Sequence, residues 1–329
     1  MNCFSVLKRA LLIGVVLLSL STCLWAADPG TELPGTSDFS DQKTGSVLVF
    51  PFYTSTATPS AQNTYVTVVN HSNDTGVNLR FTFVGNDGSF APANPLFLSA
   101  SQNITFLTSD IDPGFTGFIV VVAVNTSGFP INFNFLSGQA NIKLASGHAA
   151  SLKAEAIAAI SLPAFSGATA TLNFDGSAYN RMPRALAMDN IKSAADGNNT
   201  LLILTRVTGN YATGIVDKIG SVSGTLYDDA TTTANFTFDG SMQSFGNQLA
   251  QTLSNSFPVT TPSFTSLIPA GRSGWLYLAA NADVGLFGAV LNLNPNAGSQ
   301  ITAVNGGHNL RALRLSTSNS IIIPVVPQP

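Results

Sequence analysis

The sequence predicts an all-β chain built as two tandem antiparallel β-sandwich modules with one short linking helix. A motif that leads from a Gly-x-x-Gly turn into an apolar strand occurs twice, at 114–118 and 271–275, and a histidine follows each copy, His148 or His308. A motif that recurs over most of a chain indicates duplicated structural units. Short alternating segments separated by turn residues predict strands rather than helices.

The composition agrees with this class. Hydrophobic residues make up 45% of the chain and charged residues 9%, whereas typical soluble domains carry about 25% charged residues. Frequent Phe, Val, Ile and Thr favour strands, and this much apolar content excludes an intrinsically disordered chain.

Residues 1–27 have the pattern of a signal peptide. Lys8 and Arg9 form a positive start, residues 10–20 form an apolar core, and alanines at 26–27 form a small-residue cleavage region. We therefore expect an exported protein, extracellular or on the cell surface, with the periplasm as the alternative. The apolar core is too short for a membrane span of about 20 residues, so we expect no transmembrane segment after cleavage.

Both cysteines, Cys3 and Cys23, lie within this segment. The mature chain is therefore expected to have no disulfide and no thiolate metal site. A lipoprotein box at 20–23 is an alternative interpretation, although Thr22 before the cysteine matches that motif poorly.

The charge pattern argues against nucleic acid as a partner. The whole chain carries a net charge of −3, and loss of Lys8 and Arg9 makes it −5. Because there is no basic run, the counterion release that drives nucleic-acid binding is missing.

Residues 28–44, rich in Pro, Gly, Ser, Asp and Thr, predict a flexible leader, and residues 45–148 are expected to form the first β-sandwich module. Residues 77–83 alternate as a half-buried strand does, whereas 118–124 is continuously apolar and should be covered on both faces. Further strands of this module are expected at 47–53, 64–70, 96–107 and 131–136.

Residues 149–182 are predicted to connect the modules by a helix and a β-hairpin. Alanine favours helices, and apolar residues within 149–160 recur on one helical face, at Leu152, Ala156, Ile157 and Ile160. A hairpin is expected to follow, with a strand at 168–174 and the turn Asp175-Gly176.

The second module, 183–329, repeats the order of the first. Its strands are expected at 185–188, 201–207, 224–227, 234–238, 264–268, 275–280, 289–293, 313–315 and 321–326. The paired glycines are interpreted as architectural, and Phe118 and Trp275, which share one repeat position, as core anchors.

His148 and His308 occupy matching positions and are candidate ligand-binding residues. The alternative is a structural role, in which each ring hydrogen-bonds to a neighbouring loop. His71 lies in a polar turn and is expected to be solvated. A three-histidine zinc site would need all three to converge, and no sequence pattern indicates that.

Four aspartates are further candidates for ligand binding: Asp110, Asp112, Asp228 and Asp229. Calcium takes carboxylate and carbonyl oxygens, so such loops could hold it, but no EF-hand spacing is present. Aspartate also begins turns on its own account. No metal site is assigned and no cofactor is expected, with calcium as the alternative.

The motifs of nucleophilic, zinc-dependent and nucleotide-dependent enzymes are missing from the sequence, so no catalytic residue is assigned. Two carboxylates from distant strands could still form a glycosidase pair without a local pattern.

The order of an Asn-Thr strand, an alternating strand ending in Asp-Gly, and a Pro-x-Gly-x-x-Gly-aromatic strand resembles immunoglobulin-like modules of secreted bacterial surface proteins. The segments that carry it are 63–69, 77–88, 96–107 and 112–124, then 199–207, 234–240, 264–268 and 269–280. The resemblance implies adhesion or scaffolding and transfers no functional residue. The Cys-Trp-Cys core of antibody domains is absent.

We therefore predict a secreted, non-catalytic β-sandwich protein with a structural, adhesive or binding role at the bacterial cell exterior, toward an unidentified protein or glycan. One alternative is an exported hydrolase with a site between the modules, near His148 and His308. Another is a sugar-binding or calcium-binding module.

Overall fold

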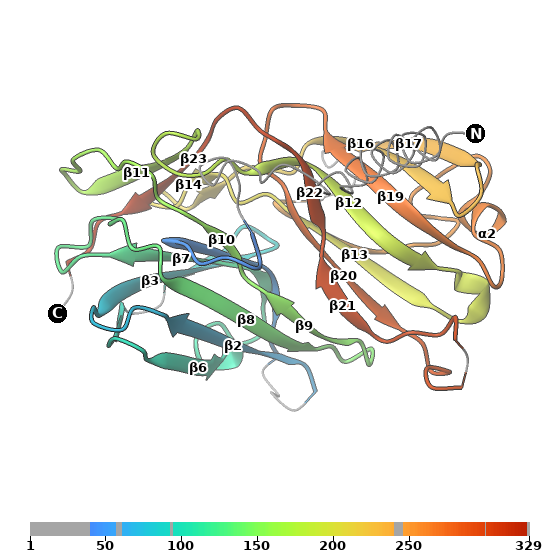
Figure 1. Ribbon diagram of the computed structural model, residues 1–329, viewed down its shortest axis with the longest axis horizontal. Coiled ribbons are helices and arrows are strands. Elements are labelled where there is room, and N and C mark those ends of the chain that lie inside the picture. Colours follow the sequence, from blue (N-terminus) through green and yellow to red (C-terminus); the bar gives the residue numbers. More distant parts are fainter. Residues whose placement is uncertain (1–39, 57–60, 93–94, 240–245, 300, 328–329) are drawn as a thin grey trace, which may run out of the picture. The chain divides into compact units, whose positions relative to one another are not determined.

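The computed structural model describes residues 40–56, 61–92, 95–239, 246–299 and 301–327. They form an all-β protein with about 4% helix. The strands make five small sheets arranged as the blades of a five-bladed β-propeller (Figure 1). The predicted signal peptide, and residues 28–39 of the predicted leader, lie outside the described residues.

Blade 1 has the strand order β10-β1-β7-β3-β4, and β5 also pairs with β3. Its strands are β1 (Val47–Thr54), β3 (Val77–Gly85), β4 (Phe90–Pro92), β5 (Leu96–Leu98), β7 (Thr116–Val124) and β10 (Glu155–Ile157). Blade 2 has the order β6-β2-β8-β9. Its strands are β2 (Asn63–Asn70), β6 (Asn103–Leu107), β8 (Leu136–Lys143) and β9 (Ala149–Lys153).

Blade 3 joins distant parts of the chain in the order β11-β23-β14-β15. Its strands are β11 (Thr169–Phe174), β14 (Gly209–Asn210), β15 (Ile215–Val216) and β23 (Asn319–Pro324). In Figure 1 the C-terminal β23, in red, lies beside the green β11. The two are antiparallel, whereas β14 and β23 pair in parallel.

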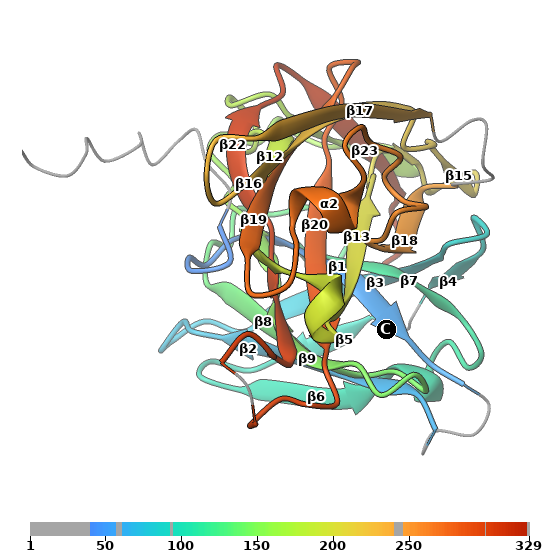
Figure 2. The same ribbon diagram turned by 90° about the vertical axis from the view of Figure 1, so that its right-hand side faces the viewer.

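Blade 4 has the order β17-β16-β19-β12-β22 and blade 5 the order β18-β13-β20-β21. The strands of blade 4 are β12 (Pro183–Lys192), β16 (Ser221–Asp228), β17 (Thr233–Asp239), β19 (Ser273–Ala280) and β22 (Arg311–Leu315). Those of blade 5 are β13 (Asn199–Thr205), β18 (Gln248–Thr252), β20 (Phe287–Leu293) and β21 (Gly306–Asn309). The helical turns are η2 (Thr108–Asp110), η3 (Ala194–Asp196) and α2 (Phe264–Leu267), and Figure 2 shows α2 between β19 and β13.

Blade 1 is buried on both faces, as the apolar run at 118–124 predicts. Side chains alternate across a strand, so Leu48 and Phe50 of β1 pack into the core shared with blade 2. Val47 and Val49 point the other way, into the core shared with blade 3. All four are fully buried.

The remaining blades complete a ring of contacts. Blades 4 and 5 enclose their own core, into which α2 inserts Phe264 and Leu267. Blade 5 meets blade 2 where β21 packs beside β9. Blade 4 reaches blade 3 through Leu315, which packs against the core that contains Ile321.

The prediction of two tandem immunoglobulin-like β-sandwich modules is wrong, and with it the interpretation of the chain as a tandem repeat of such modules. The described residues lie in one compact unit of five blades. Blade 3 combines β11 of the predicted linking segment with β14, β15 and β23 of the predicted second module, and it covers a face of blade 1 that a two-layer sandwich would leave exposed. Alternating patterns identify strands but do not specify which strands pair.

The two glycine motifs lead into corresponding central strands. Gly117 lies in β7, between β1 and β3, and Gly274 lies in β19, between β12 and β16. A Cβ atom at Gly117 would lie 1.8 Å from the carbonyl oxygen of Val84, and one at Gly274 would lie 2.2 Å from that of Tyr227. Both positions therefore require glycine because a neighbouring backbone approaches closely.

The predicted linking helix at 149–160 is wrong, because the segment forms β9 and β10. Leu152 is buried between the exposed Ser151 and Lys153, which is the alternation of a strand. Strand β9 pairs with β8, and β10 pairs with the edge of β1. These available partners override the helix propensity of alanine, because tertiary pairing outweighs intrinsic propensity.

Three smaller expectations also fail. Of the strand expected at 131–136, only Leu136 belongs to a strand, β8. The strand expected at 168–174 is β11, but it pairs with β23 and not with a neighbouring segment, so the hairpin is wrong. The turn itself exists, since the Asp175 carboxylate accepts hydrogen bonds from the amides of Ser177 and Ala178. The strand expected at 264–268 is the short helix α2.

A buried carboxyl connects blades 1 and 5. Oε1 of Glu155, in β10, accepts a hydrogen bond of 2.8 Å from Nδ2 of Asn309, at the end of β21. The same Nδ2 donates to the carbonyl oxygen of Lys153 at 2.7 Å. Burial, aided by the charge of Asp41, raises the pKa of Glu155 to about 8, and the bond from Asn309 only partly opposes this.

We predict that Glu155→Gln makes stability less sensitive to pH. A folded-state pKa of about 8 lies above the ordinary value of 4.5. As pH rises between these values the unfolded chain loses the proton while the folded chain keeps it, so the free energy of unfolding falls, by about 1.4 kcal/mol per unit of pKa difference. Urea titrations at pH 5 and pH 8 should show wild type losing a few kcal/mol relative to the variant. Parallel pH dependences would contradict this assignment.

Candidate functional site

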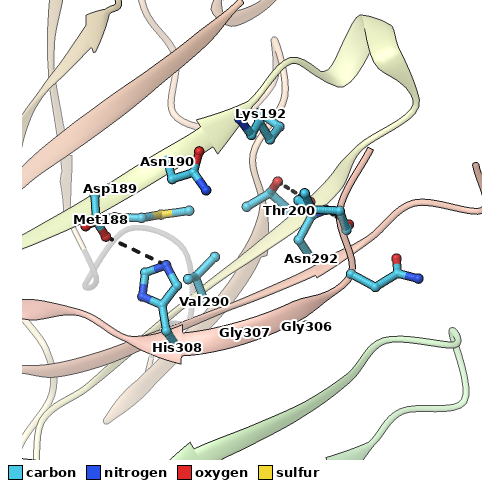
Figure 3. A pocket seen from close by; sticks show the side chains of 12 residues that line it. Met188, Asp189, Asn190, Lys192, Thr200, Val290, Asn292, Gly306, Gly307 and His308 are labelled. Atoms are coloured by element: carbon cyan, nitrogen blue, oxygen red, sulfur yellow. Dashed lines mark hydrogen bonds and ion pairs between the residues drawn. The ribbon is translucent and has the colours of Figure 1, made fainter. Parts of the chain in front are cut away.

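A cavity of about 310 Å³ lies where blade 4 faces blade 5. One wall is β12, and the other is formed by β13, β20 and β21 with the loop before β21 (Figure 3). The lining residues are Met188, Asp189, Asn190, Lys192, Thr200, Val290, Asn292, Val304, Asn305, Gly306, Gly307 and His308. Met188 and Val290 are buried and give the cavity an apolar floor.

A β-bulge in β12 shapes this wall. Pairing with β19 runs from Met188 opposite Leu276 directly to Ile191 opposite Gly274, so Asp189 and Asn190 together oppose Trp275. Asn190 has a φ of 59°, in the left-handed region that asparagine tolerates better than most residues. Bulges recur beside binding and active sites because they redirect side chains.

Asp189 is the charged centre of the cavity. Its Oδ2 lies 3.1 Å from Nε of Arg311, and its Oδ1 lies 3.8 Å from Nε2 of His308. Nδ1 of His308 is 2.9 Å from the carbonyl oxygen of Asn309. A carbonyl can only accept, so Nδ1 carries the hydrogen and Nε2 is the ring nitrogen that faces the carboxylate. Figure 3 shows this pair across the cavity.

Some polar side chains that line the cavity already have hydrogen-bond partners within the protein, and others have none among the described residues. Thr200 donates to Oδ1 of Asn292 at 2.6 Å, and Nδ2 of Asn292 donates to Asn198 at 3.0 Å. Within the described part of the chain, by contrast, the side chains of Asn190 and Lys192 make no hydrogen bond or ion pair. These two, with the half-exposed Asp189 and His308, can contact a ligand.

The arrangement is better suited to binding than to bond cleavage. Asp189 is the one carboxylate among the described lining residues, so the paired carboxyls of a glycosidase are not assembled here. The Thr200 hydroxyl donates to an amide oxygen and not to a histidine or carboxylate that could activate it as a nucleophile.

His148 lies elsewhere and is used differently. It is 3% exposed, just before β9, and is not among the lining residues of this cavity. Its Nδ1 is 2.9 Å from Oγ of Ser146, and its Nε2 is 2.9 Å from the carbonyl oxygen of Asn199. The ring therefore ties the turn between β8 and β9 to the start of β13.

The four candidate aspartates are dispersed. Asp112 is buried and accepts a hydrogen bond from the hydroxyl of Tyr53, whereas Asp110 is exposed at the end of η2. Asp228 caps a turn by accepting from the amides of Ala230 and Thr232, at 3.0 and 2.8 Å.

Asp229 forms an ion pair with Arg272, and its Oδ2 lies 3.3 Å from the amide nitrogen of Ser273. Across the described residues, no group of three or more His, Cys, Asp or Glu side chains is placed to hold a metal ion.

Sequence reasoning missed Asp189, Asn190 and Lys192. A signal was present, since Asp and Asn are depleted in strands and here interrupt an apolar run. Asn in such a place is compatible with a left-handed bulge. The facing wall could not be inferred, because apart from Thr200 of β13 it comes from β20, β21 and the loop between them, roughly a hundred residues later.

No protein-family model, curated protein or solved structure matches this chain. Among the described residues, no helix is both long and apolar enough to cross a membrane.

We predict that His148→Ala lowers the free energy of unfolding by about 1–3 kcal/mol, because it leaves buried hydrogen-bonding partners unsatisfied. His71→Ala is the matched control, since this exposed ring makes one bond, to Ser137, and its loss should cost at most about 0.5 kcal/mol. Urea denaturation measures both. Equal effects of the two substitutions would argue against the structural role of His148.

Proposed function

We propose that this chain is an exported, non-catalytic binding protein of the bacterial cell exterior, which holds a small polar ligand in the cavity between β12 and β20–β21. The observation that carries the proposal is the set of free polar side chains, Asn190 and Lys192, beside the half-exposed Asp189 and His308, over an apolar floor. Pockets that combine a few oriented polar groups with apolar lining are the usual form of small-molecule sites.

The charges in the cavity favour a ligand rich in hydroxyl or amide groups. Arg311 pairs with Asp189, so the carboxylate is available as an acceptor but is already compensated. Lys192 and Asn190 add donors, and Asn190 also adds an acceptor. Export is supported by the signal pattern of residues 1–27.

The test is a thermal-shift screen of monosaccharides, amino acids and nucleosides, with each stabilising compound then measured by calorimetry. Asn190→Ala and Lys192→Ala should each weaken binding about tenfold or more, because each removes a direct contact. Lys218→Ala, at an exposed lysine outside the cavity, is the control. If neither Asn190→Ala nor Lys192→Ala changes the affinity for the ligand, the proposed site is wrong. Turnover of a hydrolase substrate that is abolished by Asp189→Asn would instead establish the hydrolase alternative.

A further inference from the structure

The exposed face of blade 4 carries an aromatic pair that the cavity does not use. Tyr227 of β16 and Trp275 of β19 lie directly opposite each other. Their rings stack with centroids 4.1 Å apart and planes within 2°. Trp275 is 38% exposed, so the prediction that it is a core anchor like the fully buried Phe118 is wrong.

Uncharged polar side chains lie next to the aromatic pair on the same face of blade 4. Thr225 donates to Asn235 at 2.7 Å, and Ser223 donates to Asn281 at 2.8 Å. Tyr277, half-buried, lies opposite Thr225 in the same row. Aromatic rings therefore alternate with hydroxyl and amide groups along neighbouring strands.

The chemistry of this face selects one kind of partner. The carboxylate of Asp228 directly follows Tyr227, and the nearby Asp229 and Asp189 are paired with Arg272 and Arg311, so no net positive charge is offered to an anionic membrane or nucleic acid. A continuous apolar patch, as a hydrophobic protein partner would use, is broken up by the hydroxyl and amide groups. A neutral sugar offers both apolar C–H faces for stacking and hydroxyls for hydrogen bonding, and so matches both components.

Trp275, the nearer ring of the pair, lies opposite residues that line the cavity. The bulge residues Asp189 and Asn190, which line the cavity, are those that oppose Trp275 across the β12–β19 pair. Adjacent strands are about 4.8 Å apart, roughly the size of one sugar ring. A chain of sugar units could therefore occupy the cavity and continue over the rings.

We propose that the ligand is a neutral polysaccharide, with one unit in the cavity and the following units against Trp275 and Tyr227. This inference rests on the proposed binding role of the cavity and adds the class of ligand and a second subsite.

Tryptophan fluorescence gives a direct readout. The chain has two tryptophans, Trp25 and Trp275, so a full-length Trp25→Phe protein reports on Trp275 alone. The probes are cello-, chito-, xylo- and laminari-oligosaccharides of six units, with their monosaccharides. We expect at least one hexasaccharide to shift the Trp275 emission and to bind at least tenfold more tightly than its monosaccharide.

Variants separate the two subsites. Trp275→Ala should weaken hexasaccharide binding at least tenfold and leave monosaccharide affinity unchanged. Trp275→Phe should weaken hexasaccharide binding less than Trp275→Ala does. Lys192→Ala should weaken both. Tyr65→Ala, at a 53% exposed tyrosine of blade 2, is the control. The Phe variant keeps an aromatic ring in place should the Ala variant fail to fold.

Each other outcome is decisive. If Lys192→Ala weakens binding while Trp275→Ala and Trp275→Phe do not, the aromatic subsite is wrong and the cavity function stands. If the Trp275 substitutions abolish binding while Lys192→Ala has no effect, the cavity function is wrong, and so is a chain that spans both. No emission shift with any neutral glycan, or a shift only with lipid vesicles or a protein, overturns the inference.

Discussion

Blade 1 is covered on both faces, and the other elements are arranged around that constraint. Strand β1 sends Leu48 and Phe50 into one core and Val47 and Val49 into another, with none of the four exposed. A sheet apolar on both sides needs two covering layers, because either face left in water would forfeit its hydrophobic stabilisation. Blade 2 covers one face and blade 3 the other. This burial has to stabilise a chain whose two cysteines both lie in the predicted signal segment.

Covering the second face brings the first and last described strands, β1 and β23, into one core. Blade 3 is assembled from β11, β14, β15 and β23, so the C-terminal strand is needed to complete the environment of β1 and β7. The contacts that join the blades also include a hydrogen bond between polar side chains. Glu155 and Asn309 lie in different blades, and their hydrogen bond lies where burial makes an ionised carboxylate unfavourable. The same packing that stabilises the ring thus keeps the carboxyl group of Glu155 away from water.

The candidate site lies where the regular pattern of the blades is broken. Strand β12 bulges at Asp189 and Asn190, and the latter adopts a left-handed conformation that few residues accept. On the facing side the chain leaves blade 5 at Asn309 and enters blade 4 at Arg311, so His308 and Arg311 reach Asp189 from successive strands. Strained backbone of this kind persists where its surroundings hold it, and it is frequent at binding sites. The bulge also joins the cavity to the strand that carries Trp275.

The sequence by itself determined the all-β class, most strand segments and the positions where only glycine fits. These follow from local properties, such as alternation, turn chemistry and a continuously apolar run. It also marked His148 and His308, but not that one is buried in a turn contact while the other faces a carboxylate. The pairing of strands was decided only in the tertiary structure. Pairing made residues 149–157 into β9 and β10, placed β11 against β23, and set Trp275 on an exposed face. The reason is that hydrogen-bond partners and burial come from segments far apart in the chain, and no local pattern encodes which of them will meet.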